Sequence, residues 1–204
     1  MKLGSASMFR RRAGDDHYKK MKLYGFDYSD YAISGALDGK TEEEYKQSLI
    51  EAKIKNEKLG YVGEITNINI APVLDLLEKG YIPVISTIGC DKLGNAYNIN
   101  GDTAAAFIAG AMNAEKLFMM TDIDGILRDK DDPTTIIPHL TVSEAKKLYD
   151  EGVVSGGMIP KVDCCIEAIN KGVKNVTIMD GRVSHSILME LLTDEGAGTM
   201  VVGD

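Results

Sequence analysis

The sequence predicts an α/β protein with a largely parallel sheet and helices on both faces. From residue 69 onward, short apolar runs alternate with segments whose apolar residues recur at helical spacing. The run over residues 81–88 is rich in β-branched residues, as a strand buried on both faces should be. Glycine-containing polar turns follow several of these elements, in the position where open α/β sheets bind ligands.

The first 68 residues give weaker signals. Residues 1–21 are charged and aperiodic, which predicts a disordered or atypical N-terminal segment. Thr41 and Glu44 form a capping-box pattern, and apolar residues at helical spacing behind them predict a helix over 42–56. Residues 59–65 are typical of a strand with a bulge or turn at each glycine.

Capping and stop residues predict the remaining elements. Thr141 and Glu144 form a second capping box, Pro160 presets a first helical turn, and Gly80 and Gly172 are typical helix stops. The predicted helices are 69–79, 102–113, 141–152, 160–171 and 184–192, and the predicted strands are 81–88, 116–120, 173–179 and 199–202.

Composition excludes several kinds of partner. The formal net charge of −8 argues against nucleic acid or an anionic membrane, since both require a cationic surface. No apolar stretch approaches the roughly 18–20 residues of a membrane span, and no secretory or transit segment is recognisable. Cys90, Cys164 and Cys165 lack a C-x-x-C spacing, so no metal site is predicted. We expect a reduced, cytoplasmic protein without nucleic-acid or membrane partners.

Three polar turns carry the candidate chemistry. In the turn from Asn98 to Asp102, two amides could grip a carboxylate or amide of a substrate while Asp102 orients a cation. Asp102 could equally be only the N-cap of the next helix. The turn from Thr121 to Gly125 follows a predicted strand and could line a nucleotide, or it could be a plain surface turn.

The third turn, from Gly156 to Lys161, combines a flexible glycine pair with a lysine at a helix N-terminus. A lysine there opposes the helix dipole, which favours a phosphate that offsets the repulsion over a merely solvated side chain. The sequence has neither a Walker P-loop string nor a G-x-G-x-x-G fingerprint.

These turns, in this order, resemble the N-acetylglutamate kinases, a branch of the amino acid kinase family. The resemblance is strong over about residues 59–204 and weaker back to residue 22. The residues that carry it are Leu59–Glu64, Gly80–Ile85, Asn98–Asp102, Thr121–Leu127, Gly156–Lys161, Asp180–Arg182 and Thr193–Thr199.

The resemblance implies a three-layer αβα sandwich that uses ATP with nucleotide-bound Mg²⁺ to phosphorylate the side-chain carboxylate of N-acetyl-L-glutamate, in arginine biosynthesis. It implies an amino acid kinase-like domain over 22–204, a nucleotide-binding half over about 80–204 and a dimer-based homo-oligomer. Lys161 and Asp102 are the expected catalytic residues, and Asn98 and Asn100 are the expected substrate contacts. The expected nucleotide contacts are Thr121, Asp122, Ile123, Asp124, Gly125, Ile126, Leu127, Val153, Val154, Ser155 and Lys161.

The chain departs from the family pattern in two places. It has no K-x-G-G and no H-G-G-G-P string, so we expect an N-terminally shortened form that lacks a second catalytic lysine. Glu190 and Gly196 match arginine-binding residues of arginine-sensitive members, but Thr177 stands where those members carry a histidine. Arginine sensitivity is therefore not expected. The alternatives are another amino acid kinase with a different acceptor and a non-catalytic nucleotide-binding remnant.

Overall fold

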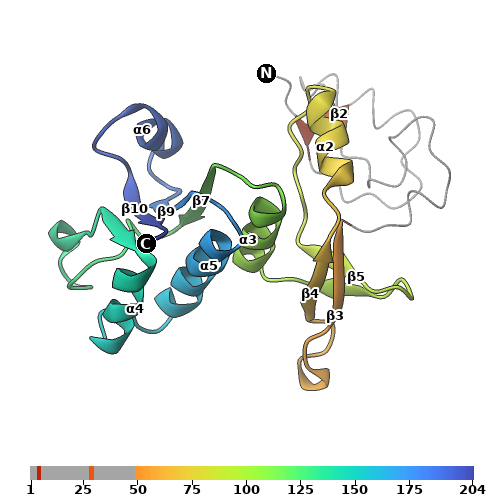
Figure 1. Ribbon diagram of the computed structural model, residues 1–204, viewed down its shortest axis with the longest axis horizontal. Helices are drawn as coiled ribbons and strands as arrows, with labels where there is room; N and C mark the ends of the chain where they lie inside the picture. Colours follow the sequence, from red (N-terminus) through yellow and green to blue (C-terminus); the bar gives the residue numbers. More distant parts are fainter. Residues whose placement is uncertain (1–3, 6–27, 30–48) are drawn as a thin grey trace. The chain divides into compact units, whose positions relative to one another are not determined.

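The computed structural model describes residues 4–5, 28–29 and 49–204. The chain divides into two compact units, residues 1–97 and 98–204, and each is considered by itself (Figure 1). The predicted segment 1–21 lies outside the described residues apart from β1 (Gly4–Ser5), which pairs in parallel with β2 (Tyr28–Ser29).

In the first unit a four-stranded sheet has the order β4-β3-β5-β6. Strand β3 runs antiparallel to β4, with a bulge after Glu51, and parallel to β5. The last strand ends at Asn98, the first residue of the second unit. The elements are β3 (Ile50–Ile54), η2 (Glu57–Leu59), β4 (Gly63–Ile68), α2 (Ala71–Glu78), β5 (Ile88–Cys90) and β6 (Ala96–Asn98).

The helix predicted over 42–56 is wrong where it can be checked, because residues 50–54 form β3. The pair Thr41 and Glu44 lies outside the described residues. Ile50 and Ala52 are both buried at a spacing of two, which is the period of a strand. Pairing with β4 therefore overrides the helical spacing of the apolar residues.

The strand predicted over 81–88 is also wrong, since residues 81–87 belong to no strand and β5 begins only at Ile88. The side chains of Ile82 and Val84 are 66% and 73% exposed. A continuous apolar run forms a buried strand only between neighbouring strands, and none of the described strands pairs with this run. The strand predicted over 59–65 begins later, at Gly63, because Gly60 turns the chain with φ +66°.

Asp91 organises the turn between β5 and β6 with both carboxylate oxygens. Oδ1 accepts the N–H groups of Leu93 and Asn95 at 2.9 Å each. Oδ2 accepts the Asn95 side-chain amide at 2.8 Å and the Tyr97 hydroxyl at 2.9 Å. These bonds, that of the Asn95 side chain first, lower the pKa of Asp91 from 3.8 to about 2.

The lowered pKa of Asp91 leads us to expect that the stability of the folded chain decreases in acid. Because its folded-state pKa is depressed, Asp91 contributes stability above its unfolded-state pKa of about 4, and that stability is lost as pH falls towards about 2. We expect Asp91→Asn to be less stable than the unaltered chain near neutral pH, with a difference that shrinks over this window. Denaturant titrations at a series of pH values measure it, and a difference that does not change with pH would contradict the assignment.

The second unit contains a four-stranded sheet of order β7-β9-β10-β8. The pairs β7–β9 and β10–β8 are parallel, whereas β9 and β10 are antiparallel, so the sheet is mixed rather than uniformly parallel. The elements are α3 (Gly101–Ala111), β7 (Lys116–Thr121), η3 (Pro133–Thr135), β8 (His139–Thr141), α4 (Val142–Asp150), α5 (Met158–Asn170), β9 (Asn175–Asp180), α6 (Ser186–Leu192) and β10 (Gly198–Val202).

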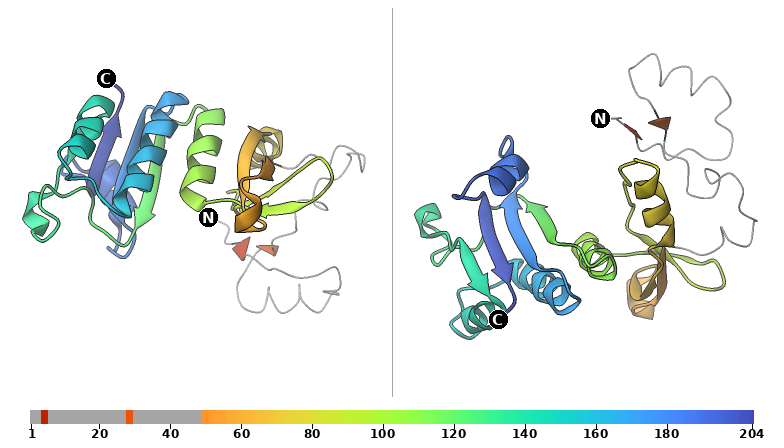
Figure 2. Two further views of the ribbon diagram at one scale, coloured as in Figure 1. Left: turned by 90° about the horizontal axis from the view of Figure 1, so that it is seen from below. Right: turned by 45° about the horizontal axis from the view of Figure 1, so that its top comes forward.

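Helices α3, α4 and α5 stand side by side along this sheet (Figure 2). Their buried faces meet the inner strand β9, which is buried from Val176 onward, in one apolar core. This core includes Ala106, Val162, Ala168, Val176 and Ile178. The capping box predicted at Thr141 is present with both of its bonds, so the sequence places the start of α4 correctly.

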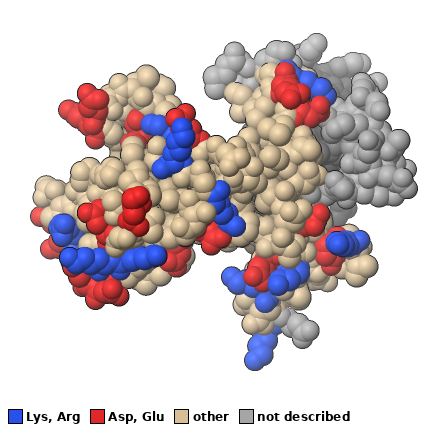
Figure 3. All heavy atoms as spheres, viewed as in Figure 1, with Lys and Arg blue, Asp and Glu red and all other residues tan. Residues whose placement is uncertain are grey.

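Charged side chains are spread over the described surface. On the face seen in Figure 3, acidic and basic side chains of the second unit are interspersed rather than gathered into one basic area. Among the described residues, no helix combines the length and apolar character that crossing a lipid bilayer demands.

Candidate active site

An ion pair joins the first turns of two neighbouring helices in the second unit. The Nζ atom of Lys161 on α5 lies 3.2 Å from Oδ2 of Asp102 on α3, across 59 residues of sequence. The side chains are 26% and 34% exposed. Both predicted catalytic residues are thus brought together at a half-buried place.

The amide of Asn100, rather than Asp102, caps α3. Its Oδ1 accepts the Thr103 N–H at 3.0 Å and the Thr103 hydroxyl at 3.2 Å. The interpretation of Asp102 as a mere N-cap is therefore wrong. Because Asn100 satisfies the helix terminus, the carboxylate of Asp102 is left to pair with Lys161. Asn98 is exposed at the end of β6, with no side-chain hydrogen bond to a described residue.

Helix α5 begins at Met158, two residues before the predicted start at Pro160. The N–H groups of Met158 and Ile159 already bond to the carbonyls of Ser155 and Gly156, so the glycine turn winds directly into the helix. Lys161 is consequently the fourth residue of α5, at the end of the first helical turn. Its charge remains close to the positive end of the helix dipole.

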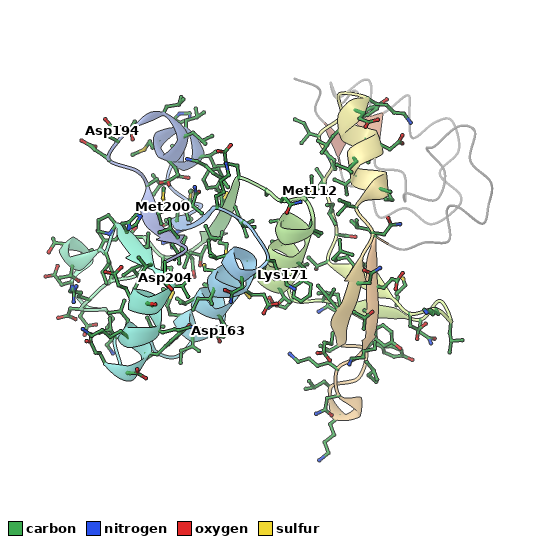
Figure 4. The ribbon with its side chains drawn as sticks, viewed as in Figure 1. Met112, Asp163, Lys171, Asp194, Met200 and Asp204 are labelled. Atoms are coloured by element: carbon green, nitrogen blue, oxygen red, sulfur yellow. The ribbon has the colours of Figure 1, made fainter. Side chains whose placement is uncertain are left out.

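Tyr149 ties α4 to the start of α5. Its hydroxyl donates to Oδ1 of Asp163 at 2.9 Å and lies 3.4 Å from the carbonyl oxygen of Ile159. Burial, followed by the bond to Asp163, raises the pKa of Tyr149. Figure 4 labels Asp163 near the start of α5 and Lys171 beyond its end. Tyr149 thus contacts α5 at two residues that flank Lys161 in sequence, while Lys161 itself pairs with Asp102.

The turn predicted to bind a nucleotide, residues 121–127, which we call the nucleotide turn, begins at the carboxyl end of β7. The carbonyl of Thr121 accepts the Gly181 N–H at 2.8 Å, and the Ile126 N–H donates to the hydroxyl of Thr199 at 2.8 Å. Gly125 packs so closely that a Cβ there would lie 2.6 Å from Oγ1 of Thr199. Asp122 and Asp124 are exposed, so the turn is fixed at its ends and open at its middle.

The remaining predicted nucleotide contacts, Val153–Ser155, lie in the loop between α4 and α5. Val154 is only 3% exposed and belongs to the core, whereas Ser155 is exposed. The N–H groups of Val153 and Val154 both bond to the carbonyl of Leu148. No hydrogen bond or ion pair among the described residues joins this loop or the nucleotide turn directly to the Asp102–Lys161 pair.

Arg182 is a site residue to which the sequence assigned no role. Its guanidinium bonds to both carboxylate oxygens of Asp180 and, at 2.6 Å, to the carbonyl of Asp122. The side-chain bonds from Arg182 are the main cause that lowers the pKa of Asp180. The sequence signal that could have identified Arg182 is the Asp-Gly-Arg motif at the end of a strand, because such a turn places two opposite charges at the edge of a sheet.

The cysteines near the pair are poor nucleophiles. Burial raises the pKa of Cys164, and it raises the pKa of Cys165 to about 12. Cys165 points at the sulfur of Met119, 3.4 Å away. Because the thiolate is the reactive form, neither side chain supports covalent catalysis here.

Glu190 on α6 is buried, with 7% exposure, and its two oxygens have separate partners. Oε1 accepts the Thr177 hydroxyl at 2.9 Å, and Oε2 accepts the Ala197 N–H at 2.8 Å. Gly196 leaves no free space, since a Cβ there would lie 3.0 Å from Oε2. The expected insensitivity to arginine stays a prediction.

The fold first defines the class of the protein. N-Acetylglutamate synthase from Neisseria gonorrhoeae, complexed with coenzyme A and N-acetyl-glutamate, aligns with 76% of this chain and 37% of its own, with a TM-score of 0.69 and 28% identity. The structure of smu.665 from Streptococcus mutans UA159 aligns over 76% of this chain and 57% of its own chain, with a TM-score of 0.63 and 30% sequence identity. Carbamate kinase from Giardia lamblia bound to AMP-PNP shares the fold, with a TM-score of 0.54. The α/β class with an amino acid kinase-like fold is confirmed.

The family model described as the amino acid kinase family matches residues 22–180, and the chain belongs to this family. It is 52% identical over 157 residues to the acetylglutamate kinase of Thermosynechococcus vestitus, covering 76% of this chain and 53% of that protein. It is 52% identical over 146 residues to the acetylglutamate kinase of Methanococcus aeolicus, and this match covers 72% of this chain and 50% of that protein. The chain thus spans about half the length of the curated relatives it matches.

Proposed function

We propose that this chain transfers the γ-phosphoryl group of ATP to the side-chain carboxylate of N-acetyl-L-glutamate, as an acetylglutamate kinase of arginine biosynthesis. The observation that carries the proposal is the half-buried Lys161–Asp102 pair at 3.2 Å. Acetylglutamate kinases about 50% identical to the chain support the same reaction. We also propose that the protein acts in the cytoplasm as a dimer-based homo-oligomer, as its family resemblance implies.

The proposed reaction requires positioning and charge neutralisation rather than a general base. The acceptor carboxylate is already ionised at neutral pH, so no proton has to be removed from it. Lys161 would stabilise the charge that develops on the transferring phosphoryl group, and Asp102 would hold the lysine side chain in place. Asn98 would contact the acceptor, and Asn100 would do so with the amide nitrogen that its capping role leaves available.

The nucleotide would lie against residues 121–127 and 153–155, where the turn ends are fixed and the middle is open. No group of three or more His, Cys, Asp or Glu side chains within the described residues could hold a metal ion. We expect the phosphates of ATP to carry the Mg²⁺ ion, because Mg²⁺ often binds through phosphates with few protein ligands. Bound there, the ion would neutralise phosphate charge during transfer.

A coupled assay of ADP release tests this function on the chain as given. We expect MgATP with N-acetyl-L-glutamate to release ADP faster than MgATP alone, and faster than MgATP with L-glutamate or L-aspartate. A faster reaction with one of the other acceptors would favour a different amino acid kinase. Binding of MgADP without ADP release would favour the non-catalytic alternative and contradict the proposed activity.

A further inference from the structure

The nucleotide turn is held at its start by an arginine from a different strand end. We propose that Arg182 is a positioning residue that fixes the backbone of the nucleotide turn for nucleotide binding. Nη2 of Arg182 donates to the carbonyl oxygen of Asp122 at 2.6 Å, across 60 residues of sequence. The neighbouring N–H of Gly181 bonds to the carbonyl of Thr121, so two consecutive carbonyls of the turn are held from the loop after β9.

Asp180 holds the guanidinium in the orientation that this contact needs. The Asp180 side chain is 8% exposed, and its Oδ1 accepts both the backbone N–H of Arg182 at 2.8 Å and Nε at 3.0 Å. Its Oδ2 accepts Nε at 3.1 Å and Nη2 at 2.8 Å. The same Nη2 therefore bridges a buried carboxylate and the turn. A lysine cannot reproduce this planar, forked arrangement.

The far end of the nucleotide turn is fixed independently. The Ile126 N–H bonds to Oγ1 of Thr199 on β10, and Gly125 is packed against the same hydroxyl. With Arg182 at one end and Thr199 at the other, the backbone between them has little freedom. A binding turn that is already ordered loses less entropy when its ligand arrives.

An ordinary surface ion pair is the competing explanation, since the Arg182 side chain is 70% exposed. Exposed pairs add little to global stability. That explanation predicts no change anywhere when the pair is lost, whereas a positioning role predicts a local change at the nucleotide turn. The inference rests on the proposed function in one respect only, namely that the ordered turn binds a nucleotide.

Amide hydrogen exchange in the ligand-free chain tests the positioning directly. In Arg182→Lys and Arg182→Ala, we expect the Gly181 amide to exchange at least about tenfold faster, while the Ile126 amide, which Thr199 holds independently, and the amides of α4 keep their rates. Arg128→Lys and Arg128→Ala are the matched controls, because Arg128 is an exposed arginine beside the same turn with no side-chain hydrogen bond to a described residue. Unchanged exchange in both Arg182 variants would overturn the proposal.

Titration with MgADP tests the link to binding. We expect the Kd to rise about tenfold in both Arg182 variants and to stay unchanged, together with the unfolding midpoint, in the Arg128 variants. Faster exchange with an unchanged Kd would overturn the link between this arginine and nucleotide affinity. If the unaltered chain fails to bind MgADP but the exchange rates change as expected, the proposed function fails and the positioning role of Arg182 is upheld.

Discussion

Replacing Lys161 by alanine is expected to lower the rate of phosphoryl transfer by about 10²–10³-fold. Asp102 pairs with the amine of Lys161 near the start of α5. On the proposed mechanism, the substitution removes a preorganised positive charge that stabilises the developing phosphoryl charge. The loss should fall mainly on kcat, because the interaction strengthens in the transition state. Single-turnover experiments, with the chain in excess over radiolabelled ATP, measure the rate of phosphoryl transfer even when it is slow.

The chain supplies a matched control for this experiment. Lys174 pairs with Glu115 at 3.3 Å, across the same 59 residues of separation, but both side chains are more than 70% exposed. Lys174→Ala should therefore leave the transfer rate unchanged. An equal loss in the two variants would show a general effect of removing a lysine, and an unchanged rate in Lys161→Ala would remove Lys161 from the mechanism.

Replacing Ile178 by alanine is expected to lower the free energy of unfolding by about 2–5 kcal/mol. Ile178 is fully buried on β9, where it lies opposite Met119 of β7 and Thr199 of β10. The truncation removes apolar contacts and leaves a cavity among residues that belong to three different elements. Denaturant titration measures the loss, provided that the slope of the transition stays constant.

Two control substitutions show whether the loss of unfolding free energy comes from a cavity in the core. Ile178→Val removes a single methylene group and should cost only about 0.5–1.5 kcal/mol. Ile187 on α6 is 39% exposed, and Ile187→Ala should cost about 0.5 kcal/mol or less. A loss in Ile178→Ala no larger than that in Ile187→Ala would contradict the assignment of β9 to the buried core.

Local signals in the sequence predicted the second unit well. The capping box of Thr141 and Glu144 depends only on side chains three residues apart, and both of its bonds are present. Gly172 ends α5 with a φ of +104°, a conformation that glycine adopts without strain. Strands β7 and β9 lie within two residues of their predicted bounds, because both runs are paired. The burial expected for both holds for β9 only, since β7 lies at the edge of the sheet and Met119 is its one buried residue.

The failures lie where a distant partner decides the local structure. Residues 50–54 were predicted as the end of a helix, yet they pair with β4 and form a strand. Residues 81–87 have strong strand propensity but no strand partner among the described residues, and they form no strand. Strand pairing is non-local, so a single window of sequence cannot reveal it.

The sequence could indicate the individual residues of the candidate site, but it could not show which of them contact one another. The sequence indicated Lys161 and Asp102 separately, and only the packing of α5 on α3 shows that they form a pair. It left open whether Asp102 caps α3, because Asn100 and Asp102 are both good capping residues. Arg182 lies 60 residues from the Asp122 carbonyl, so no spacing rule connects the two.

The long sequence separation across the Lys161–Asp102 pair also couples ligand binding to folding. Residues 59 apart meet only when α3 and α5 are docked, so the pair does not exist in the unfolded chain. Any ligand that requires the pair must then bind the folded unit alone and shift its unfolding equilibrium. At a free concentration of about 100 times its Kd, such a ligand adds about 2.7 kcal/mol to the free energy of unfolding. The melting temperature of the chain is thereby a direct gauge of site occupancy, whether or not the bound ligand reacts.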